Sequence, residues 1–378
     1  MNPSHNKKKA ISIFAISLVL LLTIGGAQLI AAPPGVPPGL LRAIEVHKAH
    51  IKQLIENPDV VGTAVGTDSS GNPLIEVFTA SEGVRGVPGN IDGFPVVVNV
   101  TGRIVAYKRP SGSGATSAVS HKAKQTPPVQ LGTSGSWKFD LANGYCCSGT
   151  LGSLVTDGTN KYVLSNWHVL YSDIVFGGNN IVARSGDSVV QPGLIDVSCN
   201  ASNAQTVATL LDPSVGGSLP NANVDAGIAQ IISNMVDTSG AILEIGTISK
   251  ATVAASIGKA VKKSGRTTGL SRSSISGLNG TVKITYENEC AGGTAFTKTY
   301  SGQIIIKNSR CGFLNSGDSG SLMVEDITTN PRAVGLLYAG SSTCSRSAIA
   351  IANPIQEVLN YFNSALNLPP GTFTMVGK

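Results

Sequence analysis

The chain has 378 residues, of which only 13% are charged, and its formal net charge is +6. Lys7, Lys8 and Lys9 supply half of that charge, and no acidic residue precedes Glu45. The remaining positive charge is too weak and dispersed to favour nucleic-acid binding. The low charged fraction, with 44 glycines, is typical of a β-rich extracellular protein with a polar, uncharged surface.

The N-terminus has the pattern of a secretory signal. The three lysines precede an apolar run from Ala10 to Ala32. The small residues Gly25 and Ala27 favour cleavage after Ala27, because Pro33 would follow a cut after Ala32. We expect residues 1–32 to be a signal peptide and the protein to be secreted. The run is also long enough to span a bilayer, so an uncleaved membrane anchor is the alternative.

A small α+β unit is predicted over residues 33–108. After a Pro/Gly-rich spacer, apolar residues at helical spacing predict a helix from Leu40 to Glu56, which Asn57-Pro58 ends. His47 and His50 share this helix. With no third ligand nearby, we interpret them as a solvated or half-buried face and not as a metal pair.

Four strands are predicted to follow that helix. Val60–Gly66 and Leu74–Thr79 flank a turn-rich segment, and Val96–Val100 and Ile104–Tyr107 look like a second hairpin across Thr101-Gly102. Residues 109–136 lack periodicity and are rich in Ser, Gly, Thr, Ala and Pro. This segment is predicted to be a flexible, exposed linker in which His121 is solvated and proteases cut.

Residues 137–378 have the pattern of an all-β domain, a barrel or a sandwich. Short β-like runs alternate with Gly, Asn, Asp and Pro turns; they are Gly149–Val155, Tyr162–Ser165, Ser188–Gln191, Thr206–Leu211, Ala226–Ile232, Thr281–Tyr286, Gln303–Lys307 and Ala333–Tyr338. A last helix is predicted, with Asn353 as its cap, Pro354 at its first position and an apolar face from Ile355 to Phe362.

Cysteines are predicted to form disulfides. An exported chain with an even number of them fits this use; they are Cys146, Cys147, Cys199, Cys290, Cys311 and Cys344. Cys146 and Cys147 are adjacent and are expected to have different partners, but the pairing stays open. No Cys-x-x-Cys pair or nearby histidine cluster suggests a metal, and no cofactor is predicted. Gly258–Gly265 lacks the order of a P-loop and is interpreted as a basic strand edge and turn.

A nucleophile is suggested by Asn315-Ser-Gly-Asp-Ser-Gly-Ser321. A hydroxyl between glycines suits a tight turn that exposes Ser319 Oγ and aims backbone N–H groups at one point, as acyl transfer needs. A plain turn is the alternative for this motif alone. His168, the one histidine of the β region, is the candidate base. Asp225 is the candidate carboxylate, with Asp212 as a rival.

These motifs together resemble the chymotrypsin-like serine peptidases. Asn166-Trp-His168 is similar to the family's histidine motif, Asp225-Ala-Gly-Ile-Ala to its aspartate strand, and Gly317-Asp-Ser-Gly320 to its nucleophile motif, in the same chain order. Ser264-Gly-Arg-Thr-Thr-Gly269 resembles a segment of secreted bacterial members such as α-lytic protease. The likeness covers roughly residues 140–365. It implies a double six-stranded antiparallel β-barrel with a C-terminal helix.

The resemblance implies a role for each matching residue. Ser319 would be the nucleophile, His168 the general acid/base and Asp225 its orienting partner, while the amides of Gly317 and Ser319 would form an oxyanion hole. Asp318 would fix the turn. The substrate pocket would be lined by Phe313, Ser316, Tyr338, Ala339 and Gly340. Without a carboxylate between Gly312 and Gly317, small or apolar side chains are the expected substrates.

The chain also departs from the family pattern. Val169 stands where many members have a cysteine, and Ser321 replaces a glycine. Tyr338 stands where many members have a serine near the catalytic aspartate, so that supporting hydrogen bond is in doubt. Cys311 lies farther from the nucleophile than the family's cysteine does, so a Cys311–Cys344 bond is plausible but open.

The function expected from the sequence is that of a secreted bacterial serine endopeptidase acting on proteins or peptides. Its N-terminal domain would be a propeptide that serves as an intramolecular inhibitor or chaperone. Two alternatives remain: a protease-like binding or adhesion module without turnover, and a protein that cleaves only itself.

Overall fold

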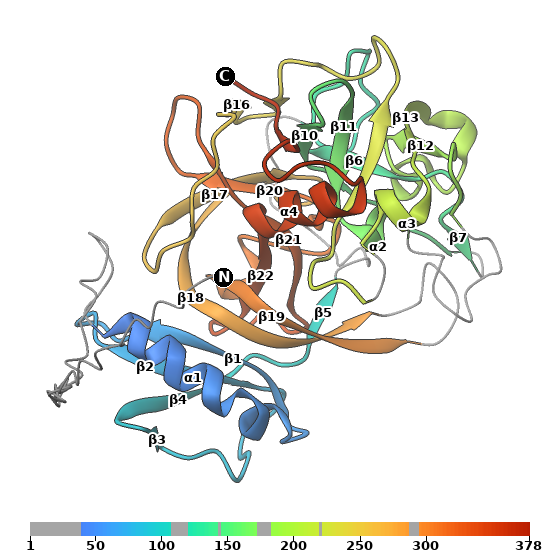
Figure 1. Cartoon of the computed structure of the whole chain (residues 1–378). Helices are drawn as coiled ribbons and strands as arrows, with labels where there is room; N and C mark the ends of the chain where they lie inside the picture. Colours follow the sequence, from blue (N-terminus) through green and yellow to red (C-terminus); the bar gives the residue numbers. More distant parts are fainter. Residues whose placement is uncertain (1–38, 107–119, 143–144, 172–182, 219–220, 287–294) are drawn as a thin grey trace, which may run out of the picture.

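The computed structural model describes residues 39–106, 120–142, 145–171, 183–218, 221–286 and 295–378. The predicted signal peptide therefore lies outside the described residues, as do residues 109–119 of the predicted linker. The described chain is mostly β, with two barrels and a C-terminal helix, so the predicted fold class is confirmed (Figure 1). No helix within these ranges is both long and apolar enough to cross a membrane.

The first barrel is an antiparallel sheet with the order β23-β10-β11-β14-β13-β12-β6-β9. Only Gly152 separates β9 from β10, so the order returns to its start and the sheet closes. Its strands are β6 (Thr133–Trp137), β9 (Gly149–Leu151), β10 (Ser153–Thr156), β11 (Lys161–Ser165), β12 (Ser188–Gln191), β13 (Gln205–Leu210), β14 (Gly227–Ile231) and β23 (Thr374–Met375). Alternating apolar residues of these strands fill its interior, among them Trp137, Leu151, Val163 and Val207.

The second barrel follows the order β17-β20-β21-β22-β19-β18, and pairing of β17 with β18 closes a ring of six strands. The strands are β17 (Ala260–Gly265), β18 (Gly269–Tyr286), β19 (Phe296–Lys307), β20 (Leu322–Glu325), β21 (Ala333–Ser341) and β22 (Ile349–Pro354). All the strands predicted in this half and in the first barrel are present. β18 and β19 extend well beyond the ring as a long hairpin.

Short elements complete the two barrels. The helical ones are α2 (Trp167–Leu170), α3 (Pro213–Gly216), α4 (Ile355–Ala365) and the 3₁₀ turns Leu194–Val197, Ala201–Asn203 and Ser309–Cys311. The short strands pair as β7 (Leu141–Ala142) with β8 (Tyr145–Cys146) and β15 (Ala241–Ile242) with β16 (Gly246–Thr247). The apolar face of α4 is buried as predicted. Its predicted cap is wrong: Asn353 and Pro354 end β22, and the Asn353 amide bonds to Asp225 instead.

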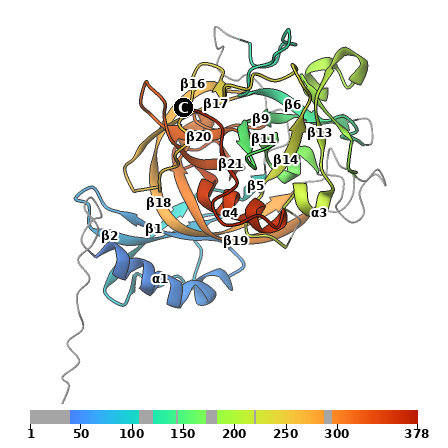
Figure 2. The ribbon, with the colours of Figure 1, turned by 45° about the horizontal axis from the view of Figure 1, so that its top comes forward.

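The N-terminal segment packs against the second barrel and continues its sheet (Figure 2). It contains α1 (Leu40–Ile55), β1 (Val60–Thr67), β2 (Pro73–Thr79), β3 (Asn90–Ile91), β4 (Phe94–Val100) and β5 (Ile104–Ala106). β1 pairs with β2 on one side and with β18 on the other. The predicted helix and strands are therefore present, but they do not form a separate sheet.

The predicted second hairpin is wrong. β4 pairs in parallel with β2, whereas β5 pairs in parallel with β18 and antiparallel with β21. All three residues of β5 are buried there, which explains why this short strand lies in the barrel and not beside β4. Between them, Gly102 has a φ of +73° and approaches the Thr343 side chain closely, so the chain turns away at that point.

Two further interpretations of the N-terminal half need correction. His47 is fully buried, with Nε2 2.8 Å from Thr63 Oγ1, and burial with repulsion from Lys48 lowers its pKa to about 4. His121 is also buried: its ring nitrogens bond to the Gly132 carbonyl and to Glu244. Residues 120–136 thus belong to the packed structure, because side chains such as Leu131 reach the core.

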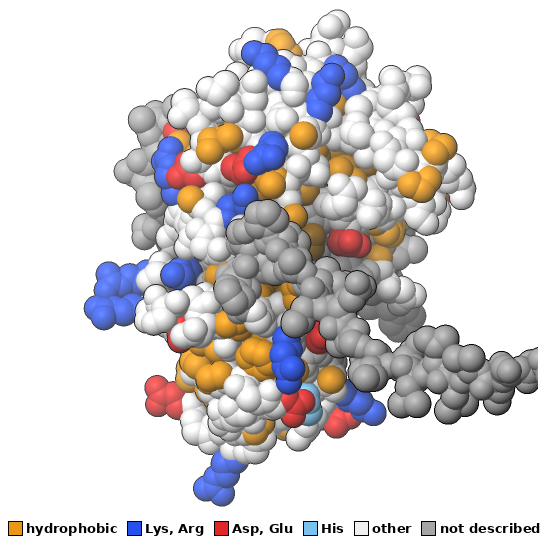
Figure 3. All heavy atoms as spheres, turned by 60° about the vertical axis from the view of Figure 1, so that its left-hand side comes forward, with side chains coloured by type: hydrophobic (Ala, Val, Ile, Leu, Met, Phe, Trp, Pro, Cys, Tyr) orange, Lys and Arg blue, Asp and Glu red, His pale blue; other side chains and the backbone are white. Residues whose placement is uncertain are grey.

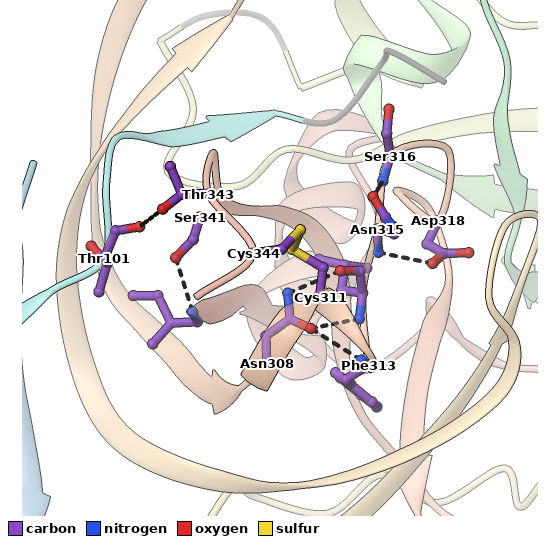
Figure 4. The surroundings of a disulfide bond; sticks show 12 residues. Thr101, Asn308, Cys311, Phe313, Asn315, Ser316, Asp318, Ser341, Thr343 and Cys344 are labelled. Atoms are coloured by element: carbon purple, nitrogen blue, oxygen red, sulfur yellow. Dashed lines mark hydrogen bonds between the residues drawn. A yellow bond between two sulfur atoms is a disulfide. The ribbon is translucent and has the colours of Figure 1, made fainter. Parts of the chain in front are cut away.

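Two disulfides join described cysteines, Cys146 to Cys199 and Cys311 to Cys344. The second is shown in Figure 4 beside Asn308, whose side chain bonds to the backbone of Phe313 and Leu314. Cys290 lies outside the described residues. On the face seen in Figure 3, Lys and Arg side chains are scattered among acidic ones, and hydrophobic side chains gather on the lower part.

Candidate active site

His168 is placed by a short helical turn at the end of a strand. β11 ends at Ser165, Asn166 is extended, and α2 begins at Trp167. The turn forms because the amides of Val169 and Leu170 both donate to the Asn166 carbonyl. His168 is thereby carried into the space between the barrels, where only 2% of its surface is exposed.

Asp225 lies just before β14 and has no exposed surface. Its amide donates to Asn353 Oδ1 at 3.1 Å, and its carbonyl accepts from the side-chain amides of Asn166 (2.7 Å) and Asn353 (3.1 Å). The rival carboxylate, Asp212, is exposed and accepts the Ser214 amide at the start of α3. Asp212 is therefore a capping residue, and Asp225 is the carboxylate of this site.

His168 and Asp225 form a buried pair. His168 Nδ1 lies 2.6 Å from Asp225 Oδ2, and the His168 amide donates to Oδ1 at 3.3 Å. The Tyr286 hydroxyl donates to Oδ2 at 2.8 Å. Burial alone would raise the pKa of Asp225, but the interaction with His168 and these hydrogen bonds outweigh it and hold that pKa below its usual value. The carboxylate is therefore ionised and orients the imidazole.

The other ring nitrogen of His168 is unused. Among the described residues, the buried Nε2 has no hydrogen-bond partner. Because Nδ1 is engaged by a carboxylate, Nε2 is the nitrogen that could accept a proton from a hydroxyl.

Ser319 lies in the loop between the 3₁₀ turn at Ser309–Cys311 and β20, and it is fully buried. Its Oγ donates to the Tyr338 carbonyl at 3.1 Å. Ser319 and the histidine turn are nevertheless neighbours: a Cβ placed on Gly149 would meet both the Val169 side chain and the Ser319 carbonyl within 3.0 Å. The structure thus joins His168 to Asp225 directly and brings the Ser319 carbonyl near the histidine turn at Val169. Within the described residues, Ser319 makes no hydrogen bond to His168.

β9 of the first barrel anchors the serine loop of the second. The Thr150 amide donates to the Ser319 carbonyl at 2.8 Å, and Thr150 Oγ1 donates to the Gly317 carbonyl at 2.9 Å. Gly320 has a φ of +93°, and a Cβ there would lie 2.2 Å from Thr150 O. Glycine at this position therefore allows the loop to approach β9 closely.

Asp318 holds the loop from its other side, as expected from the sequence. Its carboxylate accepts from the amides of Thr267, Thr268 and Asn315. Lys263 Nζ lies 3.1 Å from Asp318 Oδ2, and neither side chain is exposed. The segment predicted as a basic strand edge thus contains β17, and Lys263 of this strand is buried beside Asp318.

The amides of Gly317 and Ser319 have no acceptor among the described residues. Gly317 has a φ of +90°, a conformation that turns its peptide relative to its neighbours. Unsatisfied buried N–H groups are rare in folded proteins, and an oxyanion hole needs free amide donors, but the role of these two amides stays a prediction.

The predicted pocket residues lie around this loop. Tyr338 is fully buried with its ring against Tyr300, and Ala339 and Gly340 pair with β5. Phe313 packs into the second barrel's core with Leu314 and Val334. Ser316 is buried, and its Oγ has no partner in the described ranges. Their role in binding a substrate stays a prediction.

Sequence reasoning missed Tyr286 and Asn353, which support the pair, and Thr150 and Lys263, which support the serine loop. Each of the four lies on a different strand, so no local motif marks them. Within the described residues, no group of three His, Cys, Asp or Glu side chains could hold a metal ion.

Comparison with known proteins gives one family model, the Nal1 C-terminal domain, which matches residues 218–365, about two fifths of the chain. Similar solved structures include a glutamic acid-specific serine protease at 18% identity, with a TM-score of 0.42, covering 65% of this chain and 100% of that one. Thermobifida fusca Protease A has 20% identity, a TM-score of 0.40 and coverage of 66% and 98%. Cellulomonas bogoriensis chymotrypsin has 20% identity, a TM-score of 0.39 and coverage of 66% and 99%.

Proposed function

We propose that this chain is a secreted serine endopeptidase in which Ser319 attacks the peptide carbonyl. His168 would take the Ser319 proton through Nε2 and return it to the leaving amine, while Asp225 holds the imidazole. The amides of Gly317 and Ser319 would stabilise the oxyanion. The observation that carries the proposal is the buried 2.6 Å contact between His168 Nδ1 and Asp225, with Nε2 left without a partner among the described residues.

Export is part of the proposal. The predicted signal peptide supports it, and so do two disulfides, since such bonds persist in oxidising environments. For the substrate we keep the expectation of small or apolar side chains, because the loop beneath the serine offers no carboxylate between Gly312 and Gly317.

Labelling with a fluorophosphonate tests the reaction, because such probes phosphonylate an activated serine, whose Oγ displaces fluoride from phosphorus. We expect one adduct, on Ser319, that is lost in Ser319→Ala and is at least about 100-fold slower to form in His168→Ala. Ser321→Ala is a matched control, because Ser321 Oγ only bonds the Asp318 carbonyl in the same loop. A chain that stays unlabelled after release of its N-terminal segment would favour the binding module instead.

The alternative without turnover has one observation in its favour. Ser319 Oγ donates to the Tyr338 carbonyl and not to His168, and Ser319 has no exposed surface. Occupation by the N-terminal segment would also account for that burial, and this is the explanation we adopt.

The N-terminal segment is proposed to block the substrate site until it is cut away. β5 runs antiparallel to β21, with Ala106 opposite Ala339, directly after Tyr338, whose carbonyl accepts Ser319 Oγ. Proteins commonly bind extended peptides by adding a strand to a sheet edge in this way. The Thr343 hydroxyl also donates to the Thr101 carbonyl (Figure 4). Activity before and after release of this segment tests the proposal.

A further inference from the structure

Tyr286 contacts a member of the candidate triad, and no sequence motif predicted this contact. Its hydroxyl donates to Asp225 Oδ2 at 2.8 Å, the same oxygen that bonds His168 Nδ1. Its oxygen lies 2.5 Å from the Tyr300 hydroxyl. Because the Tyr286 proton points to the carboxylate, Tyr300 must be the donor in that second bond. A chain of hydrogen bonds thus runs from Tyr300 through Tyr286 to Asp225.

The ring of Tyr286 also fixes the imidazole. It meets His168 edge to face at 5.9 Å and Trp167 at 6.0 Å between ring centres, while Phe296 stacks on it at 4.8 Å. Only 4% of Tyr286 is exposed. Burial raises its pKa well above the usual value, and Asp225 adds to the effect, so the phenol stays protonated and remains a donor.

A tyrosine packed here only for stability would not need its hydroxyl on this oxygen. Asp225 is fully buried, and an ionised carboxylate in such a place depends on its donors. Tyr338 makes no hydrogen bond through its own hydroxyl within the described residues. The donor for Asp225 therefore comes from β18 and not from the residue beside Ser319.

We infer that Tyr286 is a positioning residue of the active site, which keeps Asp225 ionised and aimed at His168. It acts through Asp225 and touches neither substrate nor Ser319. The inference rests on the proposed function for its effect on rate, but the geometry of the His168–Asp225 pair can be measured without turnover.

Tyr286→Phe removes the hydroxyl and keeps the ring. We expect kcat to fall about 10- to 100-fold with KM nearly unchanged, the range for one charge-assisted hydrogen bond. With one donor fewer, Asp225 takes up a proton more readily, so the acid limb of the kcat/KM profile moves to higher pH. Tyr162→Phe is the matched control: it removes a tyrosine–aspartate bond of 2.7 Å, to Asp157, near the start of β11, whereas His168 follows the end of that strand, and it should leave kcat unchanged.

A proton spectrum of the full chain gives the independent measurement. The His168 Nδ1 proton, in a 2.6 Å bond to a carboxylate, should resonate far downfield. It should move upfield or broaden in Tyr286→Phe and stay in place in Tyr162→Phe. If Tyr286→Phe does not fold, Tyr300→Phe is measured, with a shift in the same direction and a loss of kcat of a few fold.

The outcomes separate the two ideas. A wild-type chain that shows the downfield proton but no Ser319-dependent labelling overturns the proposed function alone. An unchanged resonance and an unchanged rate in Tyr286→Phe would falsify the positioning role, whatever the wild-type activity. A loss of rate matched by an equal loss in Tyr162→Phe would also overturn it.

Discussion

Lys263 and Asp318 form an ion pair with no exposed side-chain surface, one residue before the candidate nucleophile. Lys263 also donates to Thr268 Oγ1 and to the Gly269 carbonyl. Burial lowers the pKa of Lys263, and the charge of Asp318 opposes that change. The Asp318 carboxylate also accepts hydrogen bonds from the amides of Thr267, Thr268 and Asn315. The ion pair therefore links the end of β17 to the serine loop.

Removing the cation would leave an unpaired buried carboxylate. Lys263→Met should lower the free energy of unfolding by roughly 3–5 kcal/mol, the usual cost of breaking a buried pair from one side. It should also slow fluorophosphonate labelling of Ser319. Urea unfolding and labelling rates measure the two effects. Arg272→Met, which breaks a half-exposed pair with Asp326, is the control and should move the midpoint little. Equal midpoints for both variants would contradict the argument.

At the scale of single residues, the sequence predicted the contacts that short local motifs determine. His168, Asp225 and Asp318 lie in local patterns whose chemistry dictates their contacts, and the first two meet as expected. Lys263 and Tyr286 could not be predicted. Their partners lie 55 and 61 residues away, and only the strand register brings them together.

At the scale of elements, β2 places a carboxylate against the second barrel. Glu76 bonds to Asn99 of β4, and its Oε2 lies near Gly277 of β18, where a Cβ would be 3.0 Å away. The side chain lines a cavity of about 240 Å³ that Lys307 and Arg346 also border. Burial raises the pKa of Glu76 to about 7, against the opposing effects of Asn99 and Lys307.

This raised pKa links stability to pH. The folded chain binds the Glu76 proton more tightly than the unfolded chain does. The contribution of protonated Glu76 to the free energy of unfolding is therefore complete below about pH 4.5. It is lost as pH rises through about 7. The total is on the order of 3 kcal/mol. Urea unfolding at several pH values should show this loss in the wild type and not in Glu76→Gln. The exposed Glu357→Gln should keep the wild-type slope, and a slope retained in Glu76→Gln would refute the assignment.

Elements were predicted better than their pairing. Short β-like runs between turn residues mark β12, β13 and β14, and consecutive residues of each strand are buried. The hairpin expected across Thr101-Gly102 failed because a turn signal fixes only the local bend. Whether β5 returns to β4 or joins β18 depends on apolar surface more than 170 residues along the chain.

At the scale of the whole molecule, the N-terminal segment and the second barrel share one sheet. β1 meets β18 at Gly62–Val282 and Thr63–Thr281, and β5 continues along the same edge at Ile284 and Thr285. Local composition predicted two units joined by a linker. Sequence reasoning could not show that their sheets would merge, because strand edges carry no pattern that names their partners.

Cleavage of the chain should therefore not be enough to release the N-terminal segment, because its strands stay paired with the second barrel. A specific protease site placed within residues 109–119 would separate the pieces covalently, yet they should stay bound until mild urea is added. Peptide hydrolysis should then rise at least about tenfold as the β21 edge opens. A Ser319→Ala chain cut in the same way is the control for contaminating protease. Full activity before the cut would exclude a blocking role.

Without the N-terminal segment, the second barrel would have an unpaired strand edge along β18. With β1 and β5 gone, amide and carbonyl groups from Leu278 to Thr285 would be bare, and so would those at the end of β21. Such open rows recruit other chains and seed aggregation. We therefore expect the covering segment to keep the barrel soluble, and a barrel without it to stay monomeric only at low concentration or with a peptide bound along the open edge.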